Sequence, residues 1–267
     1  MPVDHPPARP PLFILTSKAS PQARLRSALA QAATIVDDDC VHVIEGATPA
    51  DAIVESLFDA RLARRWSKYP PVPAEVAAYA THRLAWQALL DGGGPSALVL
   101  EDDFVVLDGR ALRRMLAAAC DLLSERRDIV KLFDLPGERE RGRSFTRTIA
   151  GIEIVKREHV RAGLVGYLIS RDGAARFLSR GRIFRVVDED IKHHWELGLD
   201  IWSVPQNLVA DASAELGGSL IENARTTTRR RSVWRSLKGN LLAAHRNWRT
   251  RGAFDQWLRQ QEARRRG

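Results

Sequence analysis

Residues 97–106 read ALVLEDDFVV, a run of strand-forming apolar residues that three adjacent carboxylates interrupt. A strand cannot carry unpaired acids through a buried sheet, because each desolvated charge must be paired or bound to a metal. We therefore expect Glu101, Asp102 and Asp103 to lie where a strand ends at the protein surface. Crowded carboxylates repel one another and favour a divalent cation, and their oxygen atoms suit magnesium or manganese. The alternative is a charged turn or a helix start after an ordinary strand.

The rest of the sequence alternates between segments with the period of strands and segments with the period of helices. Strands are expected at 12–16, 40–44, 128–133, 152–155, 166–170 and 199–204, helices at 20–33, 48–66, 73–90, 110–126, 172–179 and 188–195, and a polar, basic loop at 136–148. This alternation predicts an α/β sheet flanked by helices. Ligands of such sheets bind outside the carboxyl ends of the strands, which is where Glu101 to Asp103 fall.

Length and composition limit the class of protein. The chain has 267 residues, of which 45% are hydrophobic and 28% are charged, enough for one sizeable α/β domain with an appendage. Cys40 and Cys120 form neither a disulfide framework nor a metal-ligand spacing. No apolar run approaches the ~20 residues of a transmembrane helix, and the proline-rich start lacks the apolar centre of a signal peptide. We expect a cytoplasmic protein that contacts a membrane only at its surface.

Positive charge gathers at the C-terminal end of the chain. The segment from Arg225 to Gly267 holds 13 Lys and Arg against two acids, Asp255 and Glu262, which gives it a net charge of +11. The rest of the chain has a net charge of −3. This asymmetry indicates a polyanionic partner for the tail and not for the body.

The same tail carries an apolar stripe at helical spacing. The stripe consists of Trp234, Leu237, Leu241, Ala244 and Trp248. Tryptophan beside arginine on an amphipathic helix is typical of a helix in a membrane interface, where each basic residue contributes about 1 kcal/mol. The alternatives are a helix that packs this stripe on the body and a nucleic-acid-binding tail, although the body has no groove-reading motif. We expect residues 223–267 to form a helical tail on an anionic membrane surface, with no specific nucleic acid as partner.

Four segments, taken in order, carry a resemblance to a known family. They are Ala74–Arg83 with Trp86 and Gln87, Leu98–Phe104, Gly166–Ser170 with Gly173 and Ala174, and Val187–Asp190 with Trp195, Gly198 and Leu199. Each motif is weak alone, but the ordered set resembles glycosyltransferase family 25, the bacterial lipooligosaccharide galactosyltransferases and their relatives. The resemblance spans roughly Leu12 to Ile221.

This resemblance implies a GT-A-like nucleotide-sugar-binding sheet over residues 11–222 and a metal-dependent hexosyltransferase. The enzyme would move a hexose, expected to be galactose, from a uridine diphosphate donor to a lipooligosaccharide or another surface glycan, with inversion. Asp102 and Asp103 would hold the metal, expected to be Mn²⁺ with Mg²⁺ as the alternative, and Glu101 would orient a neighbour or face the acceptor. The glycan or lipid-linked acceptor would place the enzyme on the inner face of the cell membrane.

A second acidic segment, Asp188-Glu189-Asp190, supplies further candidates for catalysis. An inverting transfer needs a general base that takes the proton of the acceptor hydroxyl. Asp188 is our first candidate for the base or an acceptor ligand, and Asp190 and Glu101 complete the catalytic set. The alternative is that Asp188 or Asp190 caps the helix that reaches Trp195.

Three side chains are candidates for donor binding. Glu75 and His82 are seven residues apart and share one helix face, which in the resemblance looks toward the acidic strand. His82 would donate to the diphosphate or fix the Asp102 loop, and a buried core histidine is the alternative. Lys131 flanks a strand end ahead of an arginine-rich loop whose guanidinium groups suit phosphates.

Departures from the family pattern concern the donor and leave other functions open. Ala74, Ala77 and Ala78 replace the family's Gly, Gly and Cys, and the turn at 15–18 reads LTSK where the family has Asn-Leu-Asp-Arg. The alternatives are a degenerate, non-catalytic binding protein of the same fold recruited through its basic tail, and a metal-dependent phosphotransferase or hydrolase. The presence of Asp102, Asp103, Asp188 and Asp190 favours an enzyme over a binding protein. The sequence has neither a Walker A loop nor a Gly-x-Ser-x-Gly elbow, which argues against two common kinds of phosphotransferase and hydrolase.

Overall fold

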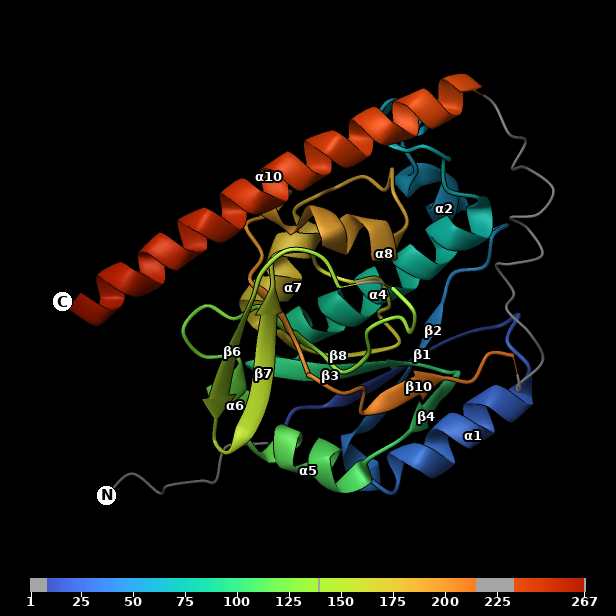
Figure 1. Cartoon of the computed structure of the whole chain (residues 1–267). Coiled ribbons are helices and arrows are strands. Elements are labelled where there is room, and N and C mark those ends of the chain that lie inside the picture. The colour runs from blue at the N-terminus through green and yellow to red at the C-terminus, as the bar shows by residue number, and fades with distance from the viewer. Residues whose placement is uncertain (1–8, 139, 215–232, 267) are drawn as a thin grey trace.

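An eight-stranded mixed sheet runs through the centre of the molecule, with helices on both of its faces (Figure 1). The computed structural model describes residues 9–138, 140–214 and 233–266. The strands of this sheet are β1 (Leu12–Ser17), β2 (Val41–Gly46), β3 (Ser96–Glu101), β5 (Ile129–Lys131), β6 (Ser144–Ile149), β7 (Ile152–Arg157), β8 (Gly166–Ser170) and β9 (Ile201–Ser203). A two-stranded ribbon joins β4 (Phe104–Val106) to β10 (Val209–Asp211). The predicted α/β sheet flanked by helices is confirmed.

The direction of the strands places the acidic segment at one end of the sheet. The strand order is β2-β1-β3-β8-β5-β9-β7-β6. β1 pairs in parallel with β2 and β3, and β5 pairs in parallel with β9, whereas β8 runs antiparallel between β3 and β5. The carboxyl ends of β1, β2, β3, β5 and β9 therefore point to the same side, and that side carries Glu101.

Different sets of helices cover the two faces of the sheet. They are α1 (Gln22–Ala32), α2 (Ala52–Leu57), α3 (Ala60–Trp66), α4 (Pro73–Asp91), α5 (Gly109–Ala117), α6 (Ala119–Leu122), α7 (Arg171–Leu178), α8 (Val187–Asp190) and α10 (Val233–Arg266), with the 3-10 turns η1 (Asp38–Cys40) and η2 (Ile191–Glu196). One core packs α4 and α7 on the sheet, and the second packs α1, α5 and α6 on the other face. β3 lies between both cores, which explains why residues 97–100 are continuously apolar and fully buried.

Two of the expected helices are shorter than predicted. The helix expected over 48–66 breaks at Phe58, which forms a β-bridge with Ile183, and Asp59 then begins α3 by accepting a hydrogen bond from the Leu62 amide at 2.8 Å. The helix expected over 110–126 gives α5 and α6 and ends at Leu122. Beyond it, Glu125 and Arg126 have left-handed backbone conformations, with φ of 54° and 69°.

The other corrections concern the segments after β5 and α8. The sequence predicts a loop over residues 136–148, but its second part belongs to β6 (Ser144–Ile149), which pairs with β7 in an antiparallel hairpin. The helix expected to reach Trp195 ends as α8 at Asp190 and continues as the 3-10 turn η2. Gly166–Ser170 forms β8 with the predicted bounds, and α4 extends the predicted helix by one residue.

The C-terminal helix α10 packs on the body along one face and passes over the layer that holds α7 and α8 (Figure 1). Thr250 and Phe254 are buried, and the Trp257 ring meets those of Phe145 and Trp202 at centroid distances of 5.2 and 5.7 Å. The described residues do not include the domain boundary expected at 222/223, residues 225–232 of the basic tail or Gly267.

The opposite face of α10 carries the apolar stripe and leaves it exposed. The exposed fractions are 80% for Trp234, 51% for Leu237, 64% for Leu241 and 67% for Trp248. The helix therefore packs on the body through other residues than the stripe. In the described part of the chain, no helix combines the length and apolarity needed to cross a bilayer.

Candidate functional site

The three adjacent carboxylates lie at the end of β3, as the sequence predicts. Glu101 is the last residue of β3 and pairs with Leu15 of β1, while Asp102 and Asp103 form the turn into β4. β4 pairs with β10 so that Asp211 stands opposite Phe104, and the Ala212 amide donates to the Asp103 carbonyl at 2.8 Å. The β4–β10 ribbon thereby fixes the acidic turn and adds a fourth acid beside it.

Asp102 is held by groups from β1 and α1. The Thr16 hydroxyl donates to Oδ2 of Asp102 at 2.6 Å, and Nη1 of Arg24 lies 3.8 Å from Oδ1. Arg24 is only 4% exposed, although it lies in the first turn of α1, the helix that follows β1. Its guanidinium is thus a buried counterion of the acidic turn.

Asp103 keeps one free carboxylate oxygen. Nη1 of Arg24 donates to Oδ2 of Asp103 at 3.3 Å, whereas Oδ1 is buried and has no hydrogen-bond partner among the described residues. Burial, followed by repulsion from Glu101 and Asp211, raises the pKa of Asp103 to about 7. Such an acid is a suitable ligand for a cation. The positive charge offsets the repulsion that raises the pKa, and the unpartnered oxygen gains a partner.

A chain of hydrogen bonds holds Glu101 from behind. The Trp86 indole donates to the Tyr167 hydroxyl at 2.9 Å, and that hydroxyl lies 2.9 Å from Nδ1 of His82. Nε2 of His82 lies 3.3 Å from Oε1 of Glu101. Since burial lowers the pKa of His82 to about 4, the imidazole is neutral. In the tautomer with its proton on Nε2, Tyr167 donates to Nδ1 and His82 donates to Glu101, so that every proton of this chain has an acceptor.

Asp188, on α8, is anchored to the loop between β7 and β8. The Gly163 amide donates to Oδ1 of Asp188 at 3.1 Å, and Oδ2 has no partner in the described part of the chain. Burial and then repulsion from Asp188, Asp211 and Asp102 raise the pKa of Glu101 to about 8. The side chain of Glu101 still keeps 36% exposure. Asp188 of the second acidic segment is therefore electrostatically coupled to Glu101 of the first.

Asp190 lies apart from this pair. It is 1% exposed and accepts from the Tyr79 hydroxyl at 2.6 Å, while Arg180 and Arg185 lie 2.8 and 3.1 Å from its oxygens. These contacts tie α4 and α8 to the segment that connects α7 to α8. The structure gives Asp190 a place in a buried ion-pair network and not beside the other candidate catalytic residues.

Two candidates for donor binding are also occupied by structural contacts. Glu75 is buried and accepts from the Val72 amide at 2.8 Å, which caps the start of α4. Lys131 is fully buried and donates to Asp134 and to the Arg161 and Ala162 carbonyls at 2.7, 2.7 and 3.1 Å. A lysine with three acceptors has no proton left for a phosphate. Of the three, His82 is the one that contacts an acid of β3 directly, through Glu101.

The atoms that could ligate a metal at this site fit a hard divalent cation in part. Its oxygens are all carboxylates, the free Oδ1 of Asp103 is buried, and neighbouring acids repel one another. Over the described residues, no three His, Cys, Asp or Glu side chains converge closely enough to hold a metal by themselves. A cation at Asp103 would therefore need further oxygen ligands from a bound molecule or from water.

Three residues of the site escape prediction from sequence. Thr16 and Arg24 look like an ordinary strand end and an exposed helix residue, and Asp211 follows a stretch without a motif. The one usable signal is position, because the carboxyl end of β1 must neighbour that of β3 in a parallel sheet. Neither the comparison with known protein families nor the comparison with curated proteins finds a match for this chain.

Proposed function

We propose that this protein is a metal-dependent glycosyltransferase related to family 25, with a GT-A-like sheet. It would transfer a hexose, galactose in the first instance, from a uridine diphosphate donor to a glycan or lipid-linked acceptor with inversion. The observation that carries the proposal is the position of Glu101, Asp102 and Asp103 at the carboxyl end of β3, where Oδ1 of Asp103 is free and Asp188 acts on Glu101 through its charge. Ligands of α/β sheets bind at this position.

Asp103 is the principal metal ligand in this proposal, with Asp102 beside it. When bound, a divalent cation supplies positive charge that stabilises the leaving diphosphate. Asp103 offers its free Oδ1, whereas Asp102 is held by Thr16 and approached by Arg24. Arg24 keeps both aspartates in place from the buried side and offsets part of their repulsion. The diphosphate itself would supply ligands that the chain does not.

Asp188 is the proposed general base. Its Oδ1 is anchored by the Gly163 amide, so that the free Oδ2 has a fixed direction from which to accept the proton of the acceptor hydroxyl. Glu101 is held by His82 and is electrostatically coupled to Asp188, and it would orient the acceptor or its hydroxyl. His82 then acts as a positioning residue, because its single donated proton is already committed to Glu101.

The direct test is turnover of a panel of nucleotide sugars with and without Mn²⁺. Asp103→Asn is expected to lower turnover by about 100-fold or more, since it removes charge stabilisation of the leaving group. Asp108→Asn is the matched control: Asp108 caps α5 through the Ala111 amide, and Asn caps equally well. Full activity of Asp103→Asn, or full activity in excess chelator, would overturn the metal assignment.

A degenerate binding protein is the second candidate, and the Arg24 contacts favour it. A guanidinium 3.3 Å from Asp103 can neutralise the acidic turn without a metal. In that case Mn²⁺ and nucleotide sugars would leave the thermal stability of the protein unchanged. In the enzyme, each ligand raises the melting temperature because it binds only the folded state.

We also propose that α10 holds the protein on an anionic membrane surface, on the inner face of the cell membrane. What supports this is the exposure of Trp234, Leu237, Leu241 and Trp248 on one helix face, beside exposed Arg249. Contacts of residues outside the stripe fix the helix: Lys238 donates to the Ser67 carbonyl at 2.8 Å, and Arg246 pairs with Glu189 at 2.9 Å. The apolar face is thus presented by a rigid support.

A further inference from the structure

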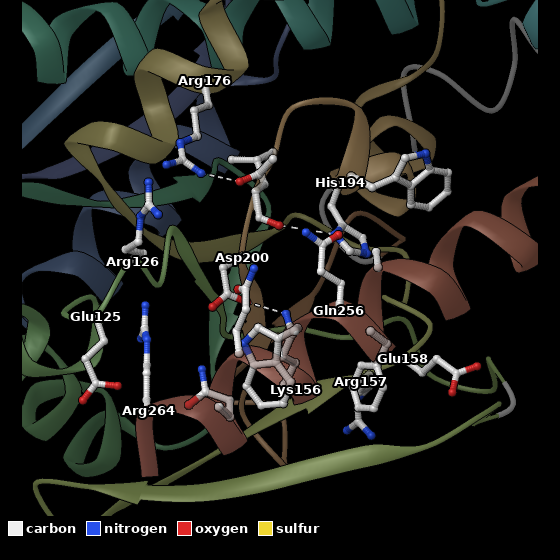
Figure 2. Close-up of a pocket in the computed structure, with 18 residues that line it drawn as sticks. Glu125, Arg126, Lys156, Arg157, Glu158, Arg176, His194, Asp200, Gln256 and Arg264 are labelled. Carbon is white, nitrogen blue, oxygen red and sulfur yellow. Dashed lines mark hydrogen bonds and ion pairs between the residues drawn. The ribbon is translucent and has the colours of Figure 1, made fainter. Parts of the chain in front are cut away.

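A cavity of about 350 Å³ lies between β7, η2 and α10, at the opposite end of the sheet from Glu101 (Figure 2). It is lined by Arg126 and Asp200, which precede the parallel strands β5 and β9, and by Arg264 near the end of α10. Because β5 and β9 run in the same direction as β3, their amino ends lie away from the acidic turn. The proposed glycosyltransferase chemistry uses none of these residues.

The acidic side chains of this cavity are already paired. Asp200 pairs with Lys156, Glu125 with Arg147 at 2.6 Å, and Glu158 with Arg143 at 2.7 Å. Arg176, which also lines the cavity, pairs with Asp128 at 3.3 Å. The carboxylates therefore leave little negative charge for the remaining cations of the cavity.

Two guanidinium groups of the lining are without such partners. Within residues 9–138, 140–214 and 233–266, neither Arg126 nor Arg264 makes a hydrogen bond or an ion pair. Figure 2 shows Arg264 pointing from α10 toward the segment that carries Arg126. Arg126 also has a left-handed backbone, with φ of 69°, which is unfavourable for a side chain of this kind. Strained residues of this sort are often kept for function.

The other lining groups suit a polar ring and not a bare ion. Trp195 and Trp257 contribute indole rings, and Gln256 and Gln260 contribute amides from successive turns of α10. Amides donate to and accept from hydroxyl groups, and indole faces pack on the apolar faces of rings. Guanidinium pairs bind phosphate oxygens through paired N–H donors. The volume exceeds what a single phosphate group needs.

We infer that this cavity is a binding site for a phosphorylated saccharide, with Arg126 and Arg264 on the phosphate. The sugar ring lies against the indoles of Trp195 and Trp257, and the glutamines of α10 reach its hydroxyl groups. The site is separate from the acidic turn, so it does not depend on the proposed transferase activity. A phosphate on a soluble glycan and a phosphate on a lipid headgroup share this chemistry, and the experiment separates them.

The test is calorimetric titration of the full chain with glucose 6-phosphate, inorganic phosphate and glucose, alongside sedimentation with phosphatidylglycerol vesicles. Glucose 6-phosphate is expected to bind more tightly than phosphate, and glucose not at all. Arg126→Gln and Arg264→Gln should each weaken that binding about tenfold, the effect of losing one charge-assisted hydrogen bond. Glucose 6-phosphate should also raise the melting temperature of the wild type, and less so that of either variant.

Arg259→Gln is the matched control, because Arg259 is exposed on α10 and does not line the cavity. Equal weakening by Arg259→Gln would mean non-specific attraction to a basic helix and would overturn the site. Equal affinity for phosphate and glucose 6-phosphate would overturn the saccharide part of the inference. Vesicle binding that requires Arg264, without binding of glucose 6-phosphate, would overturn the inference and assign the cavity to a lipid phosphate.

Discussion

Nε2 of His82 lies 3.3 Å from Oε1 of Glu101, so that the middle of α4 is tied directly to the end of β3. The direction of this bond follows from the groups behind it. Trp86 can only donate, so the Tyr167 hydroxyl accepts from it and gives its own proton to Nδ1 of His82. A neutral imidazole in one tautomer thereby positions an acid whose pKa burial raises to about 8.

Tyr167→Phe should therefore change the chemistry as well as the stability. Loss of the hydroxyl leaves the buried Trp86 N–H unpaired, at a cost of roughly 1–3 kcal/mol, and frees His82 to take either tautomer. We expect the pH dependence of turnover to shift and its maximum to fall. Tyr79→Phe is the control, because Tyr79 lies on the same helix as His82 and its replacement removes a comparable buried hydrogen bond, the one to Asp190. Identical pH profiles for the two variants would contradict the positioning role of His82.

The acidic turn should make the metal-free protein less stable as the pH rises. The folded-state pKa of Asp103 is about 7 against an ordinary value of 3.8, so between these values the unfolded chain releases a proton that the folded chain retains. Folding stability is then full below pH 3.8 and declines up to about pH 7. Asp103→Asn removes this loss and should raise the melting temperature in chelator at pH 8 by roughly 2–4 °C per kcal/mol gained.

The gain of Asp103→Asn should shrink toward pH 4, because the folded-state acid is then protonated and the unfolded-state acid, with its ordinary pKa of 3.8, is only about half ionised. Asp38→Asn changes an exposed aspartate and should be neutral throughout. Mn²⁺ at pH 8 should stabilise the wild type and leave Asp103→Asn unchanged. A variant that is destabilised equally at both pH values would show that Asp103 is an ordinary structural acid.

Periodicity and motif spacing predict most of the sheet and the acidic turn, for physical reasons. Residues 97–100 are buried on both faces, so their sequence is continuously apolar, and the acids that follow can only lie at a strand end. The break at Phe58 depends on a bridge to distant Ile183, which no local pattern reveals. Arg24 is a similar case, because its partner Asp103 is 79 residues away in the sequence and becomes visible only when α1 is placed beside the end of β3.

Replacing Asp188 should lower activity, whereas replacing Asp190 should lower stability. Asp188→Asn is expected to lower sugar transfer by about 100-fold or more, the scale of a lost general base, with little change in donor affinity. Asp190→Asn leaves Glu196 as the remaining carboxylate partner of Arg180 and Arg185 and should destabilise the fold by roughly 1–3 kcal/mol, the cost of weakened buried hydrogen bonds to charged groups. Denaturant unfolding and transfer kinetics separate the two. Loss of donor binding in Asp188→Asn would move this residue to the nucleotide site.

The exposed face of α10 can be tested without disturbing its packing. Leu241→Glu and Trp248→Glu should each reduce sedimentation with anionic liposomes while the melting temperature holds, because both side chains are largely exposed. Wild-type binding should weaken as salt rises. Leu107→Glu is the control, since Leu107 is 57% exposed and lies before α5. Unchanged liposome binding in both α10 variants would exclude the membrane proposal.

The central claim, a metal-dependent nucleotide-sugar site at the end of β3, is tested most directly by calorimetric titration of uridine diphosphate. The account predicts binding in Mn²⁺, and its loss both in excess chelator and in Asp103→Asn, with Asp108→Asn like the wild type. The physical reason is that two negative groups, the diphosphate and the acidic turn, repel without a cation between them. Equal affinity in Mn²⁺ and in chelator, or an unchanged affinity of Asp103→Asn, would contradict it.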